Sequence, residues 1–193
     1  MRQAAFVNFL ILAVILACLT ACENGNESDS DDDAAVSDDD DDDGVWTDPT
    51  SGLMWQTDES HSSGSAETNC SDLTLAGFDD WRLPSISELR TLIRGCPTTQ
   101  TGGACSVTDD CLEADCADDA CTTCAAQEGP SNGCYGPAEL PESCFLFAST
   151  SKVADADGDT YRWYVNFDSG SVVNFVECDG CKKSFSTYKR CVR

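Results

Sequence analysis

The most regular pattern of hydrophobic and polar residues lies near the C-terminus. Large apolar side chains recur at every second position, the period of a strand with one buried face: Tyr161, Trp163, Val165 and Phe167, alternating with Arg162, Tyr164 and Asn166. Asp168-Ser-Gly170 is typical of a turn, and residues 171–176 form a returning apolar run. The pattern predicts an antiparallel hairpin with an aromatic face toward the core. It also predicts a last strand over 187–192, joined to the body of the domain through Cys191.

A second strand pattern lies at the other end of the domain. Val45-Trp46 and Leu53-Met54-Trp55 flank the segment Thr47-Asp-Pro-Thr-Ser-Gly52. Asp-Pro favours the start of a turn and Gly its end, so the spacing predicts an opening β-hairpin. Both tryptophans are interpreted as packing residues rather than as a stacking platform for a ligand.

One segment has the period of a helix. Ser85 and Glu88 stand in the spacing of a capping box directly after Pro84. Apolar residues then follow at helical spacing: Ile86, Leu89, Leu92 and Ile93. The pattern predicts a helix over about 85–94 that ends at Gly95-Cys96.

The N-terminus has the layout of a bacterial lipoprotein signal peptide. Arg2 precedes an apolar run over 6–19, which is too short for a comfortable membrane span and ends in Leu19-Thr20-Ala21-Cys22. Residues 1–21 are predicted to be removed, and Cys22 to carry the lipid anchor. An ordinary signal peptide and a short buried helix are the alternatives. The chain is therefore expected to be exported and membrane-anchored, and Glu23 after the cysteine favours the outer membrane or cell surface.

Charge divides the rest of the chain at Gly44. Residues 22–43 include twelve acidic side chains and no basic one, so this linker is expected to be disordered, with cation or partner binding as the alternative. Residues 44–193 form one domain with 23 acidic and 10 basic side chains. This balance argues against nucleic acid and against anionic lipid headgroups as partners. The lipid is the expected membrane contact.

The domain contains twelve cysteines, an even number that predicts up to six disulfides in an exported protein. They are Cys70, Cys96, Cys105, Cys111, Cys116, Cys121, Cys124, Cys134, Cys144, Cys178, Cys181 and Cys191. Eight of them fall within residues 96–144, where large apolar residues are few. The pairs Cys121-Thr-Thr-Cys124 and Cys178-Asp-Gly-Cys181 also allow a zinc site or redox chemistry, although disulfides are the favoured interpretation.

Metal binding and catalysis find little support. Asp155, Asp157 and Asp159 alternate around Gly158 and could supply oxygens to calcium, but Val153 and Tyr164 stand where an EF-hand loop needs ligands. A solvated loop is favoured there, and no other cofactor is expected. His61 is the only histidine and lies in a polar stretch, and no nucleophile or phosphate-binding motif is present. No catalytic residue is assigned, and the chain is expected not to be an enzyme.

Several separate stretches resemble the Lcl C-terminal domain family, named for a collagen-like adhesin. The most specific is Asp80-Trp-Arg-Leu-Pro-Ser-Ile-Ser-Glu-Leu89. The others are Thr47-Asp-Pro-Thr-Ser-Gly-Leu-Met-Trp-Gln56, Cys70-Ser-Asp-Leu-Thr-Leu-Ala-Gly77, Ala148-Ser-Thr-Ser151, Tyr161-Arg-Trp-Tyr-Val-Asn-Phe-Asp-Ser-Gly170 and Arg190-Cys-Val-Arg193. The resemblance covers 45–193 except for 96–144, which is similar to a cysteine-rich insertion.

The resemblance implies a compact α+β domain, similar to C-type-lectin-like and sulfatase-modifying-factor folds, with antiparallel hairpins, one short helix and the disulfide-rich insertion. It implies a non-enzymatic binding role toward a glycan or surface protein, with sulfated glycans as ligands of the adhesin. A structural envelope lipoprotein without a ligand and a cysteine-dependent oxidase are the alternatives.

Some residues bear on this comparison directly. Phe147 stands where the family usually has Trp. The acidic balance disfavours a sulfated polymer, unless a local basic cluster near the C-terminus forms a patch: Lys182, Lys183, Lys189, Arg190 and Arg193. Asp80 and Arg82 are expected to form either a buried ion pair or a ligand contact.

Overall fold

A computed structural model describes residues 43–58, 66–125, 127–140, 144–155, 157–177 and 188–193. The predictions for the signal peptide, the acidic linker and several single residues fall outside this described part of the chain. The single residues are Cys22, His61, Cys178, Cys181, Lys182 and Lys183. Within the described residues, no helix is both long and apolar enough to cross a bilayer.

The predicted opening hairpin is confirmed. Strand β1 (Val45–Thr47) pairs antiparallel with β2 (Met54–Gln56), and Trp46 lies opposite Trp55. Asp48 organises the turn, because its carboxylate accepts hydrogen bonds from the Thr50 amide and the Ser51 hydroxyl. Trp55 is fully buried and Trp46 packs against the same core, so both act as packing residues as expected.

The predicted helix is also confirmed, although it is shorter than expected. Helix α2 (Ile86–Thr91) has Ser85 as its N-cap, and both hydrogen bonds of the capping box with Glu88 are present. Ile86 and Leu89 in the helix, and Leu92 and Ile93 just after it, are buried in the core. Leu92 is the C-cap, so the regular helix ends before the last two apolar residues of the pattern.

A second helix, α1 (Ala66–Ser71), shows that the expectation of one helix was wrong. It is only 6 residues long, and it lacks the apolar stripe that would have revealed it. Its position is fixed by tertiary bonds instead. Cys70 forms a disulfide with Cys191, and Glu67 forms an ion pair with Arg162 in the main sheet.

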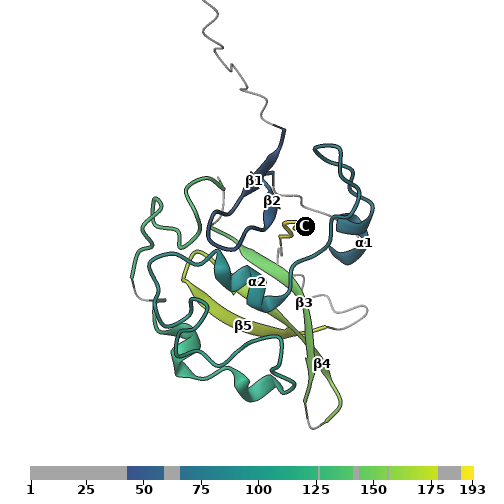
Figure 1. Cartoon of the computed structure of the whole chain (residues 1–193). Helices are drawn as coiled ribbons and strands as arrows, with labels where there is room; N and C mark the ends of the chain where they lie inside the picture. The colour runs from purple at the N-terminus through teal and green to yellow at the C-terminus, as the bar shows by residue number, and fades with distance from the viewer. Residues whose placement is uncertain (1–42, 59–65, 126, 141–143, 156, 178–187) are drawn as a thin grey trace, which may run out of the picture. The chain divides into compact units, whose positions relative to one another are not determined.

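The main sheet has the order β3-β4-β5, with all neighbours antiparallel (Figure 1). Its strands are β3 (Leu146–Ala154), β4 (Thr160–Asn166) and β5 (Ser171–Val176). The hairpin β4–β5 is the predicted one, with Trp163, Val165 and Phe167 buried in the core. The expectation of a single buried face is half right, because Arg162 and Tyr164 on the other face are buried as well. Ion pairs from Arg162 to Glu67 and Glu177 allow that face to be covered.

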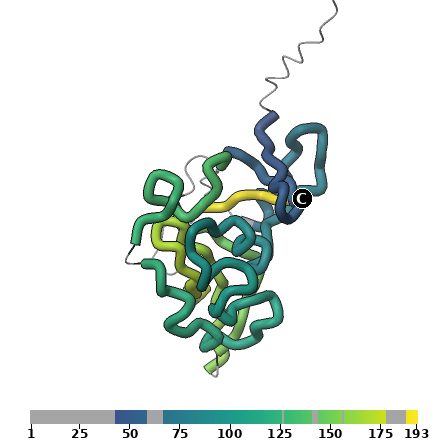
Figure 2. The backbone as a smooth tube through the Cα atoms, turned by 60° about the vertical axis from the view of Figure 1, so that its left-hand side comes forward, coloured from purple at the N-terminus to yellow at the C-terminus, as the bar shows by residue number. Residues whose placement is uncertain are grey.

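The C-terminal segment 188–193 makes isolated bridges rather than the predicted strand. Tyr188 pairs with Phe147, whereas Val192 pairs with both Trp55 and Arg82. The segment contacts three separate parts of the domain, so no continuous ladder forms among its described residues. Figure 2 shows these C-terminal residues running beside the opening hairpin. The predicted link through Cys191 is confirmed by its disulfide with Cys70.

The cysteine-rich segment 96–144, called the insertion from here on, closes four disulfides entirely within itself. They join Cys96 to Cys124, Cys105 to Cys121, Cys111 to Cys116, and Cys134 to Cys144. Its only regular elements in the described part are the 3-10 helices η1 (Ala114–Cys116) and η2 (Asp119–Thr122). Cys121 and Cys124 belong to different disulfides, so this pair is neither a zinc site nor a redox pair. The domain is thus α+β, with small antiparallel sheets, short helices and several disulfides.

Candidate functional site

A pocket of about 450 Å³ lies where three parts of the domain meet, and we call it the junction pocket. The parts are the β1–β2 turn, the C-terminal end of α2 and the first turn of the insertion. The lining residues are Thr50, Ser51, Arg90, Thr91, Ile93, Arg94, Gln100 and Thr101. Most of them carry a hydroxyl, an amide or a guanidinium, so the wall offers several hydrogen-bond donors, although most of its exposed area is apolar.

Arg90 forms part of the inner wall of this pocket. It is 2% exposed, and its guanidinium donates to the carbonyl oxygens of Thr99 (2.8 Å), Gln100 (2.8 Å) and Val107. Burial lowers the pKa of Arg90 from its ordinary value. No carboxylate forms an ion pair with it among the described residues. Arg90 therefore holds the insertion against α2 and leaves a positive charge beside the pocket.

Arg94 is the accessible cation of the pocket. Its side chain is 33% exposed, and its Nη2 atom lies 3.4 Å from Oδ1 of Asp48, whose side chain is fully buried. Burial alone would raise the pKa of Asp48, but hydrogen bonds from Ser51 and Thr50 and the charge of Arg94 lower it. Asp48 is thus ionised at neutral pH and balances one of the two guanidinium charges.

The β1–β2 turn and the insertion add hydroxyl groups to the wall. Thr50, Ser51 and Thr101 are exposed, and the Gln100 side chain is held in place by donating to the carbonyl of Ile93 (3.1 Å). The Cys96–Cys124 disulfide and the three bonds from Arg90 restrain the backbone behind them. The arrangement can bind a polar ligand by hydrogen bonds without a large rearrangement.

The sequence patterns did not identify this pocket. One signal was available, because Arg90 follows Leu89 on the apolar stripe of the predicted helix, where a charge needs internal partners. The other lining residues lie in turns, and their sequence pattern has no recognisable period.

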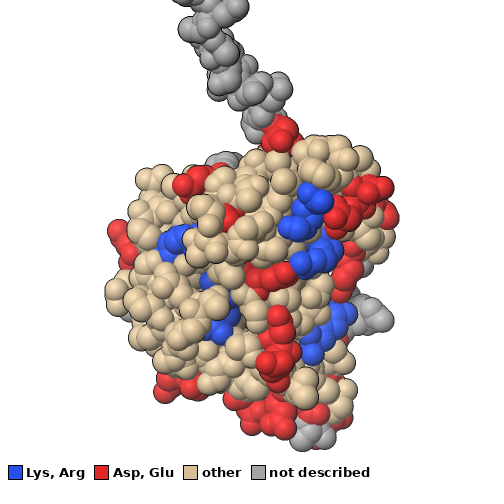
Figure 3. All heavy atoms as spheres, in the orientation of Figure 1, with Lys and Arg blue, Asp and Glu red and all other residues tan. Residues whose placement is uncertain are grey.

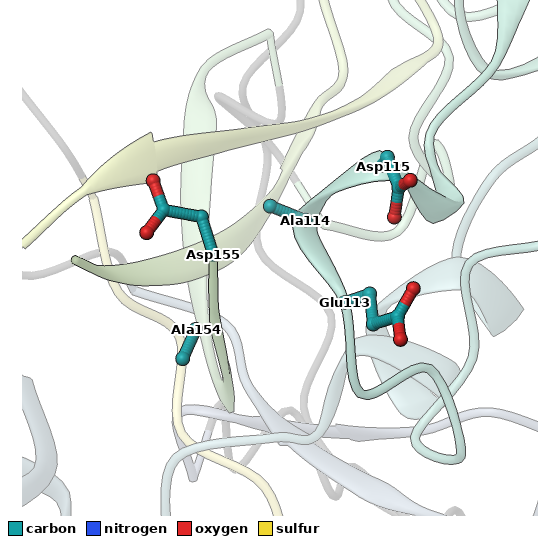
Figure 4. A pocket seen from close by; sticks show the side chains of 5 residues that line it. All are labelled: Glu113, Ala114, Asp115, Ala154 and Asp155. Carbon is teal, nitrogen blue, oxygen red and sulfur yellow. The ribbon is translucent and has the colours of Figure 1, made fainter. Parts of the chain in front are cut away.

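A second pocket, of about 440 Å³, is acidic and includes a residue of the predicted calcium loop (Figure 4). Glu113 and Asp115 come from the insertion, and Asp155 follows the end of β3, with its carboxylate on the other side of the pocket in Figure 4. Both oxygens of Asp155 already accept hydrogen bonds, from the amides of Asp157 and Asp159 and from the Tyr161 hydroxyl. Among the described residues no group of three or more His, Cys, Asp or Glu side chains is arranged to hold a metal. Calcium binding at Asp155, Asp157 and Asp159 stays a prediction.

Of the suggested basic patch near the C-terminus, the described residues are buried or only partly exposed. Lys189 is 4% exposed and Arg190 is 2% exposed, and burial lowers the pKa of Lys189. Arg190 donates to the carbonyl of Gln56 (2.7 Å). Arg193 forms an ion pair with Asp80 (2.7 Å) and stacks over the Phe78 ring. Lys189 and Arg190 are therefore buried, and Arg193 is engaged by Asp80 and Phe78 at the domain surface.

Of the two alternatives for Asp80 and Arg82, the ion pair between them is wrong, and a ligand contact stays a prediction. Asp80 pairs with Arg193, and Arg82 makes two hydrogen bonds to Glu88, at 2.7 and 2.6 Å. Phe147, the departure from the family pattern, is a core residue that meets Phe167 edge to face and lies under the Arg190 guanidinium. A cysteine-dependent oxidase would need two free thiols close together. All ten described cysteines form disulfides.

The fold and the junction pocket define a small disulfide-rich α+β domain with a partly cationic pocket at the edge of an insertion. A sequence model of the Lcl C-terminal domain family matches residues 44–193, so the chain belongs to this family. The match includes the insertion and begins at Gly44, where the acidic linker ends. No curated protein and no solved structure matches the chain.

Proposed function

We propose that the chain is an exported lipoprotein, attached to a membrane through Cys22, whose domain is a non-enzymatic binding module at the cell surface or in the periplasm. Its ligand is a glycan or a surface protein. The junction pocket is the observation that carries the binding role, because its wall offers hydroxyl, amide and guanidinium groups in a fixed arrangement. Sugars present hydroxyl groups in many directions, and a wall with both donors and acceptors can match them.

The finer fold proposal is a C-type-lectin-like or sulfatase-modifying-factor-like arrangement. Support comes from the way the two ends of the domain meet. Val192 bridges to Trp55 in the opening hairpin, and Cys191 is bonded to Cys70 in the first helix, 121 residues earlier. This closure leaves the long connection between α2 and β3, which includes the insertion, free to shape a binding site.

A structural envelope lipoprotein without a ligand is the second candidate. The observation that favours it is the number of disulfides, which would make the domain durable whether or not it binds anything. The two candidates differ in whether the junction pocket is occupied.

The binding role is tested by screening the purified full chain, in neutral detergent, on a broad glycan array with calcium and with EDTA. Thr101→Trp should abolish binding, since Thr101 is exposed on the pocket wall and the indole would fill the pocket. Thr74→Trp is the matched control at an exposed position that does not line it. Binding that survives Thr101→Trp would place the ligand elsewhere, and a blank array from a folded chain would favour the structural role.

The lipid anchor is tested separately by Cys22→Ala in the producing bacterium. We expect the protein to move from the membrane fraction to the soluble fraction, and the mass of the N-terminal peptide to lack the acyl chains. A variant that remains in the membrane would refute attachment through Cys22.

A further inference from the structure

The charge of the domain and the charge of the junction pocket differ in sign. The domain has 23 acidic and 10 basic side chains, so its field repels a densely charged anionic polymer. Figure 3 shows acidic side chains gathered around the β3–β4 turn and the insertion on the face in view. At the junction pocket, by contrast, Asp48 pairs with Arg94, and Arg90 has no carboxylate partner among the described residues.

Arg90 and Arg94 differ in how many of their N–H groups remain available to a ligand. Each of the three guanidinium nitrogens of Arg90 donates to a backbone carbonyl. Arg90 therefore contributes charge to the pocket rather than direct contacts with a ligand. Arg94 uses Nη1 for the carbonyls of Thr91 and Ile93 and Nη2 for Asp48, whereas its Nε has no partner among the described residues. A 3.4 Å separation from Asp48 is long for a charged hydrogen bond, which leaves room for a better acceptor.

We propose that the junction pocket selects an otherwise neutral glycan that carries a single carboxylated sugar, and that Arg94 binds the carboxylate. This inference rests on the proposed binding function and names its ligand class. A planar carboxylate matches the guanidinium geometry. The hydroxyls of Thr50, Ser51 and Thr101 bind the neutral part of the sugar. A polyanion gains the same contact at Arg94 but is repelled by the acidic surface around it.

Asp48 then acts as an internal competitor for Arg94. Its carboxylate forms an ion pair with Arg94 when the pocket is empty. A ligand carboxylate must share or replace this contact. Asp48→Asn keeps an oxygen that can accept hydrogen bonds from the turn but removes the competing charge. Binding of the anionic glycan should therefore become tighter in this variant, a direction that a merely structural role of Asp48 does not produce.

The test is calorimetric titration of the full chain in neutral detergent with three probes. They are a xylo-oligosaccharide that carries one glucuronate, the same oligosaccharide without it, and heparin as the polyanion. We expect the glucuronate form to bind at least about tenfold more tightly than the neutral form, as a charge-assisted hydrogen bond provides. Heparin should bind more weakly than the glucuronate form at physiological salt.

Substitutions assign the effect to Arg94. Arg94→Gln should remove the preference for the glucuronate form, so that both xylo-oligosaccharides bind with similar affinity, while Arg94→Lys should keep part of the preference. Arg82→Gln is the matched control, because it removes the same charge from a residue that does not line the pocket. Thermal unfolding of each variant shows whether it is folded.

The outcomes separate the two proposals. Equal affinity for both xylo-oligosaccharides, a preference for heparin, or a glucuronate preference that survives Arg94→Gln would overturn the inference while glycan binding stands. If no probe binds and the broad array is also blank, the binding function itself fails. If Asp48→Asn is folded and binds the glucuronate form no more tightly, the competitor role is refuted.

Discussion

The scaffold and the insertion are stabilised in different ways. The scaffold, residues 44–95 and 145–193, buries a core of aromatic and aliphatic side chains and has 14 acidic and 10 basic residues. The insertion, residues 96–144, has nine acidic residues, no Lys or Arg, and four internal disulfides. Its buried large side chains are few, among them Val107, Tyr135 and Leu140.

The comparison shows that the insertion depends on the scaffold for its hydrogen bonds. Three of its carbonyls are satisfied by Arg90 of α2, and the Thr99 hydroxyl donates to the carbonyl of Gly170 in the β4–β5 turn (2.6 Å). The Tyr135 amide donates to the carbonyl of Phe167 (2.7 Å). Cross-links restrict the insertion, and scaffold groups then position it. The candidate site lies where these two kinds of structure meet.

The largest expected effect comes from opening the scaffold disulfide. Replacing Cys70 and Cys191 by Ala releases a loop with a separation of 121 residues, so the unfolded chain gains much conformational freedom. The free energy of unfolding should fall by about 4–5 kcal/mol in the chain-entropy model. The matched change at Cys111 and Cys116, separated by 5 residues, should cost about 2 kcal/mol. Urea unfolding measures both, and equal losses would contradict the loop-length argument.

Arg90→Leu should have the next largest effect, because it leaves three insertion carbonyls without their donor. We expect a loss of about 3 kcal/mol in unfolding free energy and faster proteolysis within 96–144 than in the β4–β5 hairpin. Limited proteolysis with mass spectrometry locates the cuts. If the insertion stays as resistant as in the wild type, its dependence on the scaffold is refuted.

The ion cluster that joins α1 to the sheet should make stability depend on acid. Burial would raise the pKa of Glu67, but the hydrogen bond and charge of Arg162 lower it from 4.5 to about 2. A lowered carboxyl pKa stabilises the fold above the unfolded value, and this contribution disappears as the pH falls from about 4.5 toward 2.

Glu67→Gln removes the pH-dependent stabilisation that the Glu67 carboxylate provides. Because the carboxylate is two-fifths exposed, we expect the wild type to lose only about 1 kcal/mol more than the variant over this window. Urea unfolding at pH 5, 4 and 3 measures the difference. Parallel pH profiles of the two proteins would contradict the assignment to Glu67.

The smallest effect is expected at the contact between the insertion and the start of α2. The Asp109 carboxylate accepts hydrogen bonds from the Ser85 hydroxyl (2.8 Å), the Ser151 hydroxyl (3.1 Å) and the Ser87 amide (3.2 Å). Asp109→Ala should cost about 0.5–1 kcal/mol because the site is exposed. Asp110→Ala is the control, since no hydrogen bond of its side chain is recorded in the described structure. Equal effects of the two changes would show that the contact does not stabilise the domain.

Local sequence patterns were sufficient to predict an element wherever its burial pattern or its capping bonds involve residues that are close in the chain. The alternation at 161–167, the turn at Asp48 and the capping box of Ser85 and Glu88 predicted their elements because each depends on near neighbours in the chain. The even number of cysteines and the expected export of the chain predicted disulfides without any knowledge of geometry. Pairing could not be predicted, because it depends on which cysteines the fold brings within about 6 Å.

The sequence by itself determined the family, the α+β class, the β1–β2 and β4–β5 hairpins, the α2 helix and the cross-linked nature of the insertion. Only the tertiary structure decided that α1 forms, that both faces of β4 are buried, that Lys189 and Arg190 are buried, and that Arg90 and Arg94 meet Thr50 and Ser51 in one pocket. The reason is physical. These outcomes depend on contacts between residues far apart in the chain, and a charge on its own does not show whether its partner will be a carbonyl, a carboxylate or a ligand.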